Sequence, residues 1–476
     1  MKNIFYTLTL IVAVATTLSF GACKKSEIYS LSVPANGIIV SKPGDSGTTT
    51  FDSSNITSIT ATSIPKGWVV DNINMYEGTI TVTSPSTFSN SEEYSGTLTL
   101  NGYSPTGNTK TISIHLSIVE SVVDYTATPA NCYIASKPDT RYMFNPMIKG
   151  DNTPIETSKV EIIWQTNEDI IQYLDMRDGV ASFYIGATKN NDSEDIVLIS
   201  GNALIGAYDE ANNLLWSWHI WATNNDPTAS ENIIYIGGVE MMNINLGADG
   251  NSNGSTNKKE IVNSYGLYYQ WGRKEPFVGP ESYNFSLNED HSMTNQSGRT
   301  ARIKYVESTS SEGTMQWANE NPLSIIKGNK ENNYDWIYSG HESQWSEENN
   351  PCPAGWRVPD ASVFENLTIA TSYDEMAWEE LQPLYGIMLT DTATNEEHFF
   401  TAQGRRNYLD CRLDIINDDE VCPVPWSGYY WSASTNGNDA SAMFFDLNTA
   451  TRTWNGCDTK HAMHRANALP IRCVRE

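Results

Sequence analysis

The residues best suited to recognition chemistry gather near the end of the chain. Residues 434–441 are Ser-Thr-Asn-Gly-Asn-Asp-Ala-Ser, and residues 448–461 mix Asn, Thr and Gly with Trp, Arg and His. Ser, Gly and Asn supply adaptable hydrogen bonds, and aromatic side chains supply anchors, so the segment predicts a ligand-binding surface. The alternative is a solvated loop whose composition follows from exposure. The candidate binding residues are Trp431, Asn436, Asn438, Asp439, Arg452, Trp454, Asn455 and His461.

The sequence contains no phosphate-binding loop and no His-Glu-x-x-His pair. Its single Gly-x-Ser-x-Gly match, residues 250–254, falls in a Gly/Asn/Ser-rich segment that is typical of a loop, so it predicts no catalytic elbow. His461 and His464 lie three residues apart in a polar segment, which predicts surface imidazoles rather than metal ligands. Acidic residues are numerous enough to supply a glycosidase pair, but nothing singles out two of them. We therefore predict a protein without catalytic residues, metal or cofactor, and a glycan-acting enzyme is the alternative.

The charge balance argues against anionic partners. The 476 residues include 30 Lys and Arg against 57 Asp and Glu, a net charge of −27. A chain this acidic repels nucleic acid and anionic lipid headgroups. The chain is also rich in Thr, Ser, Asn, Gly and Tyr, which favours strands over helices.

The first residues carry a secretion signal. Met1-Lys2 precedes an apolar and hydroxyl stretch from Ile4 to Phe20, which is followed by Gly21-Ala22-Cys23. This order of a basic start, a short apolar core and small residues is typical of a secretory signal. The Cys after Gly-Ala makes it resemble a bacterial lipoprotein signal, which implies removal of residues 1–22 and lipidation at Cys23. We expect an outer-membrane lipoprotein that faces outward. The alternatives are the periplasmic face and an ordinary cleaved signal.

Two β-sandwich units are predicted before the C-terminal part. Residues 27–120 contain alternating runs such as 79–83 and 111–118, separated by Gly, Pro, Ser and Asn clusters. Within this unit, Ile-Pro-Lys-Gly-Trp at residues 64–68 resembles the Ig-like (BACON-like) modules of Bacteroidetes surface lipoproteins. Residues 124–224 repeat the strand pattern, most clearly in a hairpin across residues 201–221. Trp216 and Trp218 share one face of that hairpin, and we predict that its aromatic residues pack a domain junction.

Residues 232–476 form the third predicted unit. Asp360 is a candidate N-cap, and Val363, Phe364 and Leu367 follow it at helical spacing. A second helix is predicted across residues 373–384, and strands return near residues 428–432 and 469–474. The fold class is thus mainly β with an α+β C-terminal domain.

The chain resembles a known family from the second unit onward. The segments NALIGAYDEANNLLWSWHIWAT, MMNINLGA, GLYYQWGRKEPF and PCPAGWRVP, in this order, resemble secreted Bacteroidetes proteins with a C-terminal major paralogous (FISUMP) domain. That family has no established catalytic residue set. The order Cys-x-x-Gly-Trp-Arg-x-Pro, helix, strands and terminal Arg-Cys is similar to C-type-lectin-like domains. The resemblance implies a disulfide between Cys352 and Cys473, and ligand binding at the terminal hairpin. This terminal hairpin also resembles the sequence-variable end of proteins with the same fold that are diversified by retroelements.

Two expectations concern calcium and the remaining cysteines. Glu275-Pro276-Phe277 and Trp454-Asn455-Gly456 each lack one ligand of the lectin calcium motifs, so calcium is an alternative to the predicted absence of a cofactor. Cys411 and Cys422 are candidates for a second disulfide. Cys132 and Cys457 have no obvious partner, and are either buried thiols or a pair across the domain junction. An oxidase of the formylglycine-generating type, which shares the lectin-like fold, is an alternative that would use Cys411, Cys422 and Cys457.

These observations predict a lipid-anchored, non-catalytic adhesin or ligand-binding protein with a stalk and a lectin-like head. The expected partners are the outer membrane, a glycan or a host or bacterial surface protein, and pilus subunits if the chain is a pilus tip or accessory subunit. The rival interpretation is a structural or anchor subunit of a surface assembly.

Overall fold

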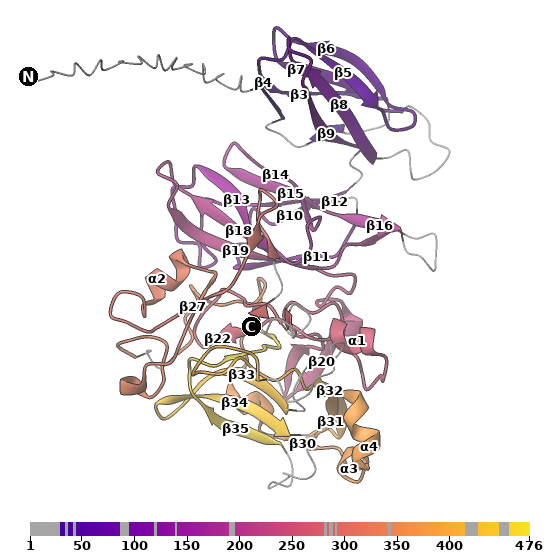
Figure 1. The fold of residues 1–476 in the computed structure, drawn as a ribbon. Coiled ribbons are helices and arrows are strands. Elements are labelled where there is room, and N and C mark those ends of the chain that lie inside the picture. The colour runs from indigo at the N-terminus through magenta and orange to yellow at the C-terminus, as the bar shows by residue number, and fades with distance from the viewer. Residues whose placement is uncertain are drawn as a thin grey trace, which may run out of the picture.

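The computed structural model describes residues 29–476, except 34–36, 41–43, 86–94, 119–120, 139, 190–195, 280–282, 285–288, 291–292, 341–343, 415–426 and 447–456. The predicted signal and Cys23 lie outside the described residues. The described chain is mainly β, as predicted, and its three regions follow one another in space from the indigo N-terminal sandwich to the yellow C-terminal strands (Figure 1). Among the described helices, none is long and apolar enough to cross a membrane.

The first region is a β-sandwich. Sheets β2-β9-β8-β5 and β3-β7-β6, with the pair β1-β4, enclose one apolar cluster. Ile80 and Val82 alternate with half-buried Thr along β7, as the period of a strand requires. Trp68 is buried in the same cluster and serves packing. The strands are β1 (Ser30–Ser32), β2 (Gly37–Val40), β3 (Ser46–Thr50), β4 (Asp52–Ser54), β5 (Ser58–Ser63), β6 (Val69–Asn74), β7 (Thr79–Thr83), β8 (Ser95–Tyr103) and β9 (Thr109–Ile118).

The second region is also a sandwich. Sheet β10-β12-β15-β14 packs on a six-stranded sheet with the order β11-β19-β18-β13-β25-β26, and the two share an apolar cluster. The predicted hairpin is β18 and β19, closed by a turn in which Asn212 has a φ of 66°. The strands are β10 (Ser121–Asp124), β11 (Cys132–Ala135), β12 (Thr140–Phe144), β13 (Lys159–Gln165), β14 (Ile171–Arg177), β15 (Val180–Ile185), β16 (Ala187–Lys189), β17 (Ile196–Leu198), β18 (Gly201–Tyr208) and β19 (Leu214–Ala222).

The second and third regions are not separate packing units. Strands β25 (Met293–Thr294) and β26 (Thr300–Ala301) come from the C-terminal part yet complete the six-stranded sheet of the second sandwich. One apolar cluster contains Trp164 and Trp221 of that sandwich together with Trp271 and Trp431 of the C-terminal part. A continuous core therefore joins the two regions.

The C-terminal region combines small sheets with short helices. Its largest hairpin, β33 with β34, ends in a tight turn at Gly437, whose φ of 62° suits glycine. Its elements are β20 (Ile233–Ile236), β21 (Val239–Met242), α1 (Lys258–Asn263), β22 (Tyr269–Gln270), β23 (Tyr283–Asn284), β24 (Glu289–Asp290), β27 (Lys304–Val306), α2 (Met315–Glu320), β28 (Ser324–Ile326), β29 (Trp356–Arg357), β30 (Leu367–Ile369), α3 (Thr371–Asp374), α4 (Trp378–Leu381), β31 (Gly386–Asp391), β32 (Glu396–Thr401), β33 (Ser427–Asn436), β34 (Asp439–Asp446), β35 (Asp458–Met463), β36 (Ala468–Leu469) and β37 (Val474–Arg475).

The helix predictions of this region were wrong in extent. After Asp360 the chain makes only a 3₁₀ turn, Ala361–Phe364, and then enters β30. The segment 373–384 breaks into α3, α4 and a further 3₁₀ turn. Val363, Phe364 and Leu367 are buried in a second apolar cluster, so tertiary packing satisfies the apolar pattern without a continuous helix.

The described cysteines form one disulfide and three free thiols. Cys352 and Cys473 form a disulfide, as the family resemblance implied. Cys411 is a free, fully buried thiol in the apolar cluster around that disulfide, so its predicted pairing with Cys422 is wrong. Cys422 lies outside the described residues. Cys132 and Cys457 are also free.

We predict that the disulfide is a major source of stability. It closes a segment with a sequence separation of 121, and replacing Cys352 and Cys473 by Ala should lower the free energy of unfolding by about 4–5 kcal/mol. Urea denaturation followed by tryptophan fluorescence measures this change. Reductant should destabilise the wild-type chain by the same amount and leave the double variant unchanged. A reductant effect on the variant would show that another bridge carries the stability.

Candidate functional site

A buried loop carrying three consecutive charges lies between the second sandwich and the C-terminal region. Tyr268 and Phe277 close the loop through two backbone hydrogen bonds of 2.9 and 2.8 Å. Gly272 turns the chain with a φ of 83°. Arg273, Lys274 and Glu275 within it are all buried. This placement is unusual for ionisable side chains and requires partners for each of them.

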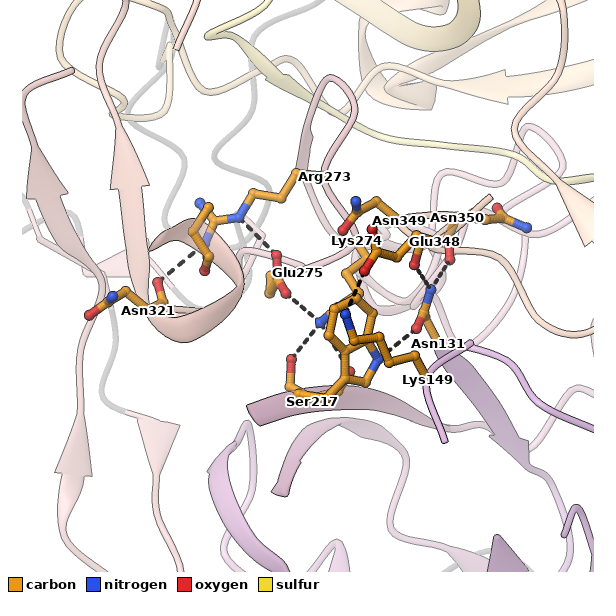
Figure 2. Close-up of polar contacts among 12 residues, drawn as sticks. Asn131, Lys149, Ser217, Arg273, Lys274, Glu275, Asn321, Glu348, Asn349 and Asn350 are labelled. Carbon is orange, nitrogen blue, oxygen red and sulfur yellow. Dashed lines mark hydrogen bonds and ion pairs between the residues drawn. The ribbon is translucent and has the colours of Figure 1, made fainter. Parts of the chain in front are cut away.

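Glu275 bridges two cations that point to different parts of the molecule (Figure 2). Its Oε2 accepts from Nε of Arg273 at 3.0 Å, and its Oε1 accepts from the ammonium of Lys274. Arg273 then donates to the carbonyl oxygens of Ser324, Ala318 and Asn321 in the C-terminal region at 2.7 to 3.2 Å.

Lys274 reaches the second sandwich instead. Its Nζ donates to Oγ and O of Ser217 at 2.8 and 3.1 Å and lies 4.0 Å from the ring centre of Trp216. The charged triad Arg273–Glu275–Lys274 therefore connects β19 to the C-terminal region through fully buried bonds.

The protonation of the triad follows from burial and charge together. Burial alone would raise the pKa of Glu275, but the Lys274 and Arg273 cations beside it hold that pKa below its ordinary value. Burial lowers the pKa of Lys274 and of Arg273, and the Glu275 carboxylate opposes that change. The triad is thus a charged, hydrogen-bonded unit in the core.

A second polar connection lies beside the triad and orders the segment before Cys352. Asn131 donates from Nδ2 to the carbonyl oxygens of Glu348 and Asn350 at 2.8 and 2.9 Å, and its Oδ1 accepts from Nε1 of Trp216 at 2.9 Å. Lys149 forms an ion pair of 2.6 Å with Glu348 (Figure 2). These bonds hold residues 348–350 against the second sandwich.

A cleft of about 900 Å³ opens at this junction. The second sandwich contributes residues 129–131 and 150–151, and the C-terminal region contributes 344–347, 350, 352–355, 357–358, 360, 433–435 and 476. Four acidic side chains and one basic side chain line it: Asp151, Glu347, Asp360, Glu476 and Arg357. Arg357 is already bonded to Asp360 at 2.9 Å. The cleft thus offers acceptors, hydroxyls and amides, and its single guanidinium is paired.

Trp345 is the aromatic side chain in the cleft lining. It is half-buried, its Nε1 donates to the carbonyl oxygen of Asn349 at 2.8 Å, and its ring meets Trp271 edge-on at 5.8 Å. Sequence reasoning missed this residue. The run Gln-Trp-Ser-Glu-Glu-Asn-Asn at residues 344–350 has the same mixture of aromatic and small polar residues that singled out the terminal loop.

Four of the eight predicted terminal residues lie around the β33–β34 hairpin. Asn436 and Asn438 are exposed at the tip of the β33–β34 hairpin. Asp439 accepts from His464 and Asn333 at 2.8 and 2.9 Å, and His461 is bonded to Asp458 at 2.9 Å. These side chains gather around one hairpin, which borders the cleft through residues 433–435.

The other predicted residues do not join that group. Trp431 is fully buried, and its Nε1 donates to the carbonyl oxygen of Tyr269 at 2.7 Å. Its prediction as a binding residue was wrong, because it lies on a strand whose inward face enters the core rather than on a loop. Arg452, Trp454 and Asn455 lie outside the described residues.

A thiol, an imidazole and an amide form a hydrogen-bonded chain across β11, β19 and β18. Sγ of Cys132 lies 3.3 Å from Nδ1 of His219, and Nε2 of His219 lies 2.8 Å from Oδ1 of Asn202. Asn202 donates from Nδ2 to the carbonyl oxygen of Gly247, so its Oδ1 is an acceptor. His219 therefore donates from Nε2 and accepts a hydrogen bond from the Cys132 thiol at Nδ1.

The residue types match a Cys–His–Asn nucleophile system, but the environment does not. Cys132 and His219 are each 1% exposed. Burial raises the pKa of the Cys132 thiol and lowers the pKa of His219 to about 3. A reactive cysteine needs the opposite thiol shift and access to a substrate. Burial likewise raises the pKa of Cys411 to about 12, which gives no support to an oxidase.

Metal-binding geometry is not found in the described part of the chain. There, no three His, Cys, Asp or Glu side chains come together in an arrangement that could hold an ion. Glu275, the first residue of the incomplete calcium motif, is bonded to two cations.

Comparisons with known proteins give no assignment. No protein-family model and no curated protein matches the chain. Among solved structures, the D00-D0 domain of Intimin has a TM-score of 0.18 at 10% identity, covering 40% of this chain and 96% of its own. A chimeric titin Z1Z2 has a TM-score of 0.14 at 12% identity, covering 41% of this chain and 95% of its own. SGBP-B of the Bacteroides ovatus mixed-linkage glucan utilization locus, in complex with a heptasaccharide, has a TM-score of 0.11 at 12% identity, covering 39% and 43%. Scores this low support no argument about this chain.

We predict that the triad is essential to the fold. Glu275→Gln should lower the free energy of unfolding by about 3–5 kcal/mol, because Arg273 and Lys274 would stay buried without a counter-charge. The matched control is Glu365→Gln, which removes an exposed ion pair with Lys460 and should cost less than about 1 kcal/mol. Equal small effects of the two variants in urea denaturation would refute the role of the triad.

The burial of His219 predicts a pH dependence of stability. Since its pKa falls from 6.5 in the unfolded chain to about 3 in the folded one, stability is fully present above pH 6.5. It is lost as the pH falls toward 3, because only the unfolded chain binds the proton. This group contributes a slope of up to about 1.4 kcal/mol per pH unit. His219→Gln should lack that contribution when urea denaturation is repeated from pH 7 downward. Parallel slopes in the two proteins would contradict a neutral buried His219.

Proposed function

We propose that the protein is a non-catalytic binding protein of the cell envelope that holds its ligand in the cleft between the second sandwich and the C-terminal region. The observation that carries this proposal is the assembly of the cleft from both regions at the place where the buried triad joins them. A rigid junction presents the lining side chains without a cost for ordering them, which favours binding.

The size and lining of the cleft support a ligand of moderate size. A volume of about 900 Å³ lies within the range of pockets that enclose small molecules or short segments of a polymer. Its lining combines a fixed aromatic ring with carboxylates, amides and hydroxyls, which suits a glycan or a segment of a surface protein. The hairpin tip with Asn436 and Asn438 would extend this surface beside the cleft.

The proposed location and architecture follow from the sequence. Lipidation at Cys23 would attach the chain to the outer membrane, and the first sandwich would act as a spacer. The C-terminal region would be a FISUMP-type, C-type-lectin-like head, an assignment supported by the sequence blocks around Trp271 and Cys352 and by the Cys352–Cys473 bridge.

A non-catalytic role is supported by the chemistry of the buried groups. The Cys132–His219–Asn202 chain has the residue types of a nucleophilic site, but it is sealed from solvent and neutral. Catalysis would require these groups to be accessible.

A structural subunit of a surface assembly is the second candidate function. Strand β6 is at the edge of its sheet, Val69 on it is exposed, and Tyr76 in the adjoining turn is 98% exposed. Edge strands with exposed apolar side chains can add a strand from a neighbouring chain.

The proposed function is tested by filling the cleft with a large side chain. Ala354 is exposed in the lining, so Ala354→Trp should occupy the cleft without disturbing the fold. Residues 24–476, which omit the predicted signal and Cys23, are screened on an array of glycans and matrix proteins beside this variant. Binding by the variant should be at least about tenfold weaker, a loss of about 1.4 kcal/mol.

Ala393→Trp, an exposed substitution outside the cleft lining, is the matched control and should bind as wild type. Binding that survives Ala354→Trp would overturn the cleft as the site. Absence of any ligand for the folded wild-type chain would favour the structural-subunit role.

A further inference from the structure

We propose that the ligand of the cleft is an uncharged oligosaccharide that stacks on Trp345. This inference rests on the proposed function and narrows it to one class of ligand. Three observations support it: the fixed aromatic ring, the acceptor-rich lining, and the ion pairs that already engage Arg357 and Lys149.

Trp345 is held in a single orientation before any ligand arrives. Its indole Nε1–H is bonded to the carbonyl oxygen of Asn349, and its ring packs edge-on against the fully buried Trp271. Trp345 stays partly exposed and is one of the residues that line the cleft. An immobilised, partly exposed aromatic face suits the C–H face of a pyranose, since the apolar contact forms without loss of side-chain freedom.

The polar groups around the ring match the hydroxyls of a sugar. Gln344, Ser346 and Glu347 flank Trp345 in the sequence and are exposed in the lining. Asp151 and Glu476 line the cleft as well. Carboxylate oxygens accept hydrogen bonds from sugar hydroxyls, and hydrogen bonds to charged groups are stronger than neutral ones.

The charges of the cleft disfavour an anionic ligand. Four carboxylates line it against one guanidinium, and that guanidinium, on Arg357, is bonded to Asp360. Lys149, the nearby cation of the second sandwich, is paired with Glu348 and does not line the cleft. A sialylated, sulfated or uronic-acid glycan would therefore meet like charge without a compensating cation.

A cationic peptide is the remaining competitor, and electrostatics distinguishes it from a neutral sugar. Binding of a peptide would depend on the carboxylates as charges, so it would weaken in salt and on loss of one charge. Binding of a neutral sugar uses the same carboxylate oxygens as hydrogen-bond acceptors. It depends mainly on stacking of the sugar against the indole ring of Trp345.

The experiment uses residues 24–476, without the predicted signal and Cys23, in calorimetric titrations with named probes. These are cello-, laminari-, xylo- and manno-oligosaccharides as neutral ligands, sialyllactose and heparin oligosaccharides as anionic ones, and oligolysine as the cationic one. We expect binding of at least one neutral probe and none of the anionic probes. The affinity for the neutral probe should change less than about twofold between about 50 and 500 mM NaCl.

Single substitutions test whether the ligand contacts Trp345. Trp345→Ala should weaken neutral-sugar binding about tenfold, Trp345→Phe should retain most of it, and Glu347→Gln should change it only slightly. Trp378→Ala, a half-buried tryptophan outside the cleft lining, is the matched control and should bind as wild type. If Trp345→Ala fails to fold, sugar binding by the Trp345→Phe variant and by the cleft-filling Ala354→Trp variant decides the same question.

The outcomes separate this inference from the proposed function. Preference for an anionic glycan, or salt-sensitive binding of oligolysine that Ala354→Trp abolishes, would overturn the sugar inference and leave the cleft as a binding site. Neutral-sugar binding that is insensitive to both Trp345→Ala and Ala354→Trp would overturn the inference and the cleft together.

Discussion

The buried ion triad is the constraint on which the rest of the C-terminal architecture depends. Glu275 cannot be buried without both Arg273 and Lys274, and each cation finds its remaining partners in a different region. The loop satisfies its three charges only when the second sandwich and the C-terminal region are docked in one arrangement. That arrangement also places strands β25 and β26 in the sandwich sheet and brings the two walls of the cleft together.

Such a triad fixes geometry more than it adds stability. Removing three charged groups from water is costly, and an apolar replacement of equal volume would often stabilise a core as well or better. Apolar contacts, however, tolerate sliding, whereas donors and acceptors at fixed distances do not. Because Lys274 must meet Ser217 and Arg273 must meet the carbonyl of Ser324, the two regions have a single register. A binding site assembled across a junction requires that register.

The sequence predicted features governed by local pattern. The alternation in β7, the β18–β19 hairpin and the mainly β fold class follow from apolar period and turn residues, and the family resemblance implied the Cys352–Cys473 bridge. The sequence did not predict where side chains meet across long separations. Trp431 sits in a segment of recognition-like composition but points inward, and the cleft combines residues near 130, 345 and 434 that no local pattern relates. The apolar spacing after Asp360 suggested a helix because it cannot distinguish one helix face from a turn and strand packed on the same core.

The two chemically suggestive sites show that environment, rather than residue type, determines what a group can do. Cys132, His219 and Asn202 have the identities and spacing of a nucleophilic system, yet burial keeps the thiol protonated and the imidazole neutral, so the chain of hydrogen bonds only ties three strands together. Trp345 and its polar neighbours form no catalytic motif, but they face an opening and are held in place by bonds behind them. Recognition requires a fixed surface with access to solvent, and of these two sites the cleft has both properties.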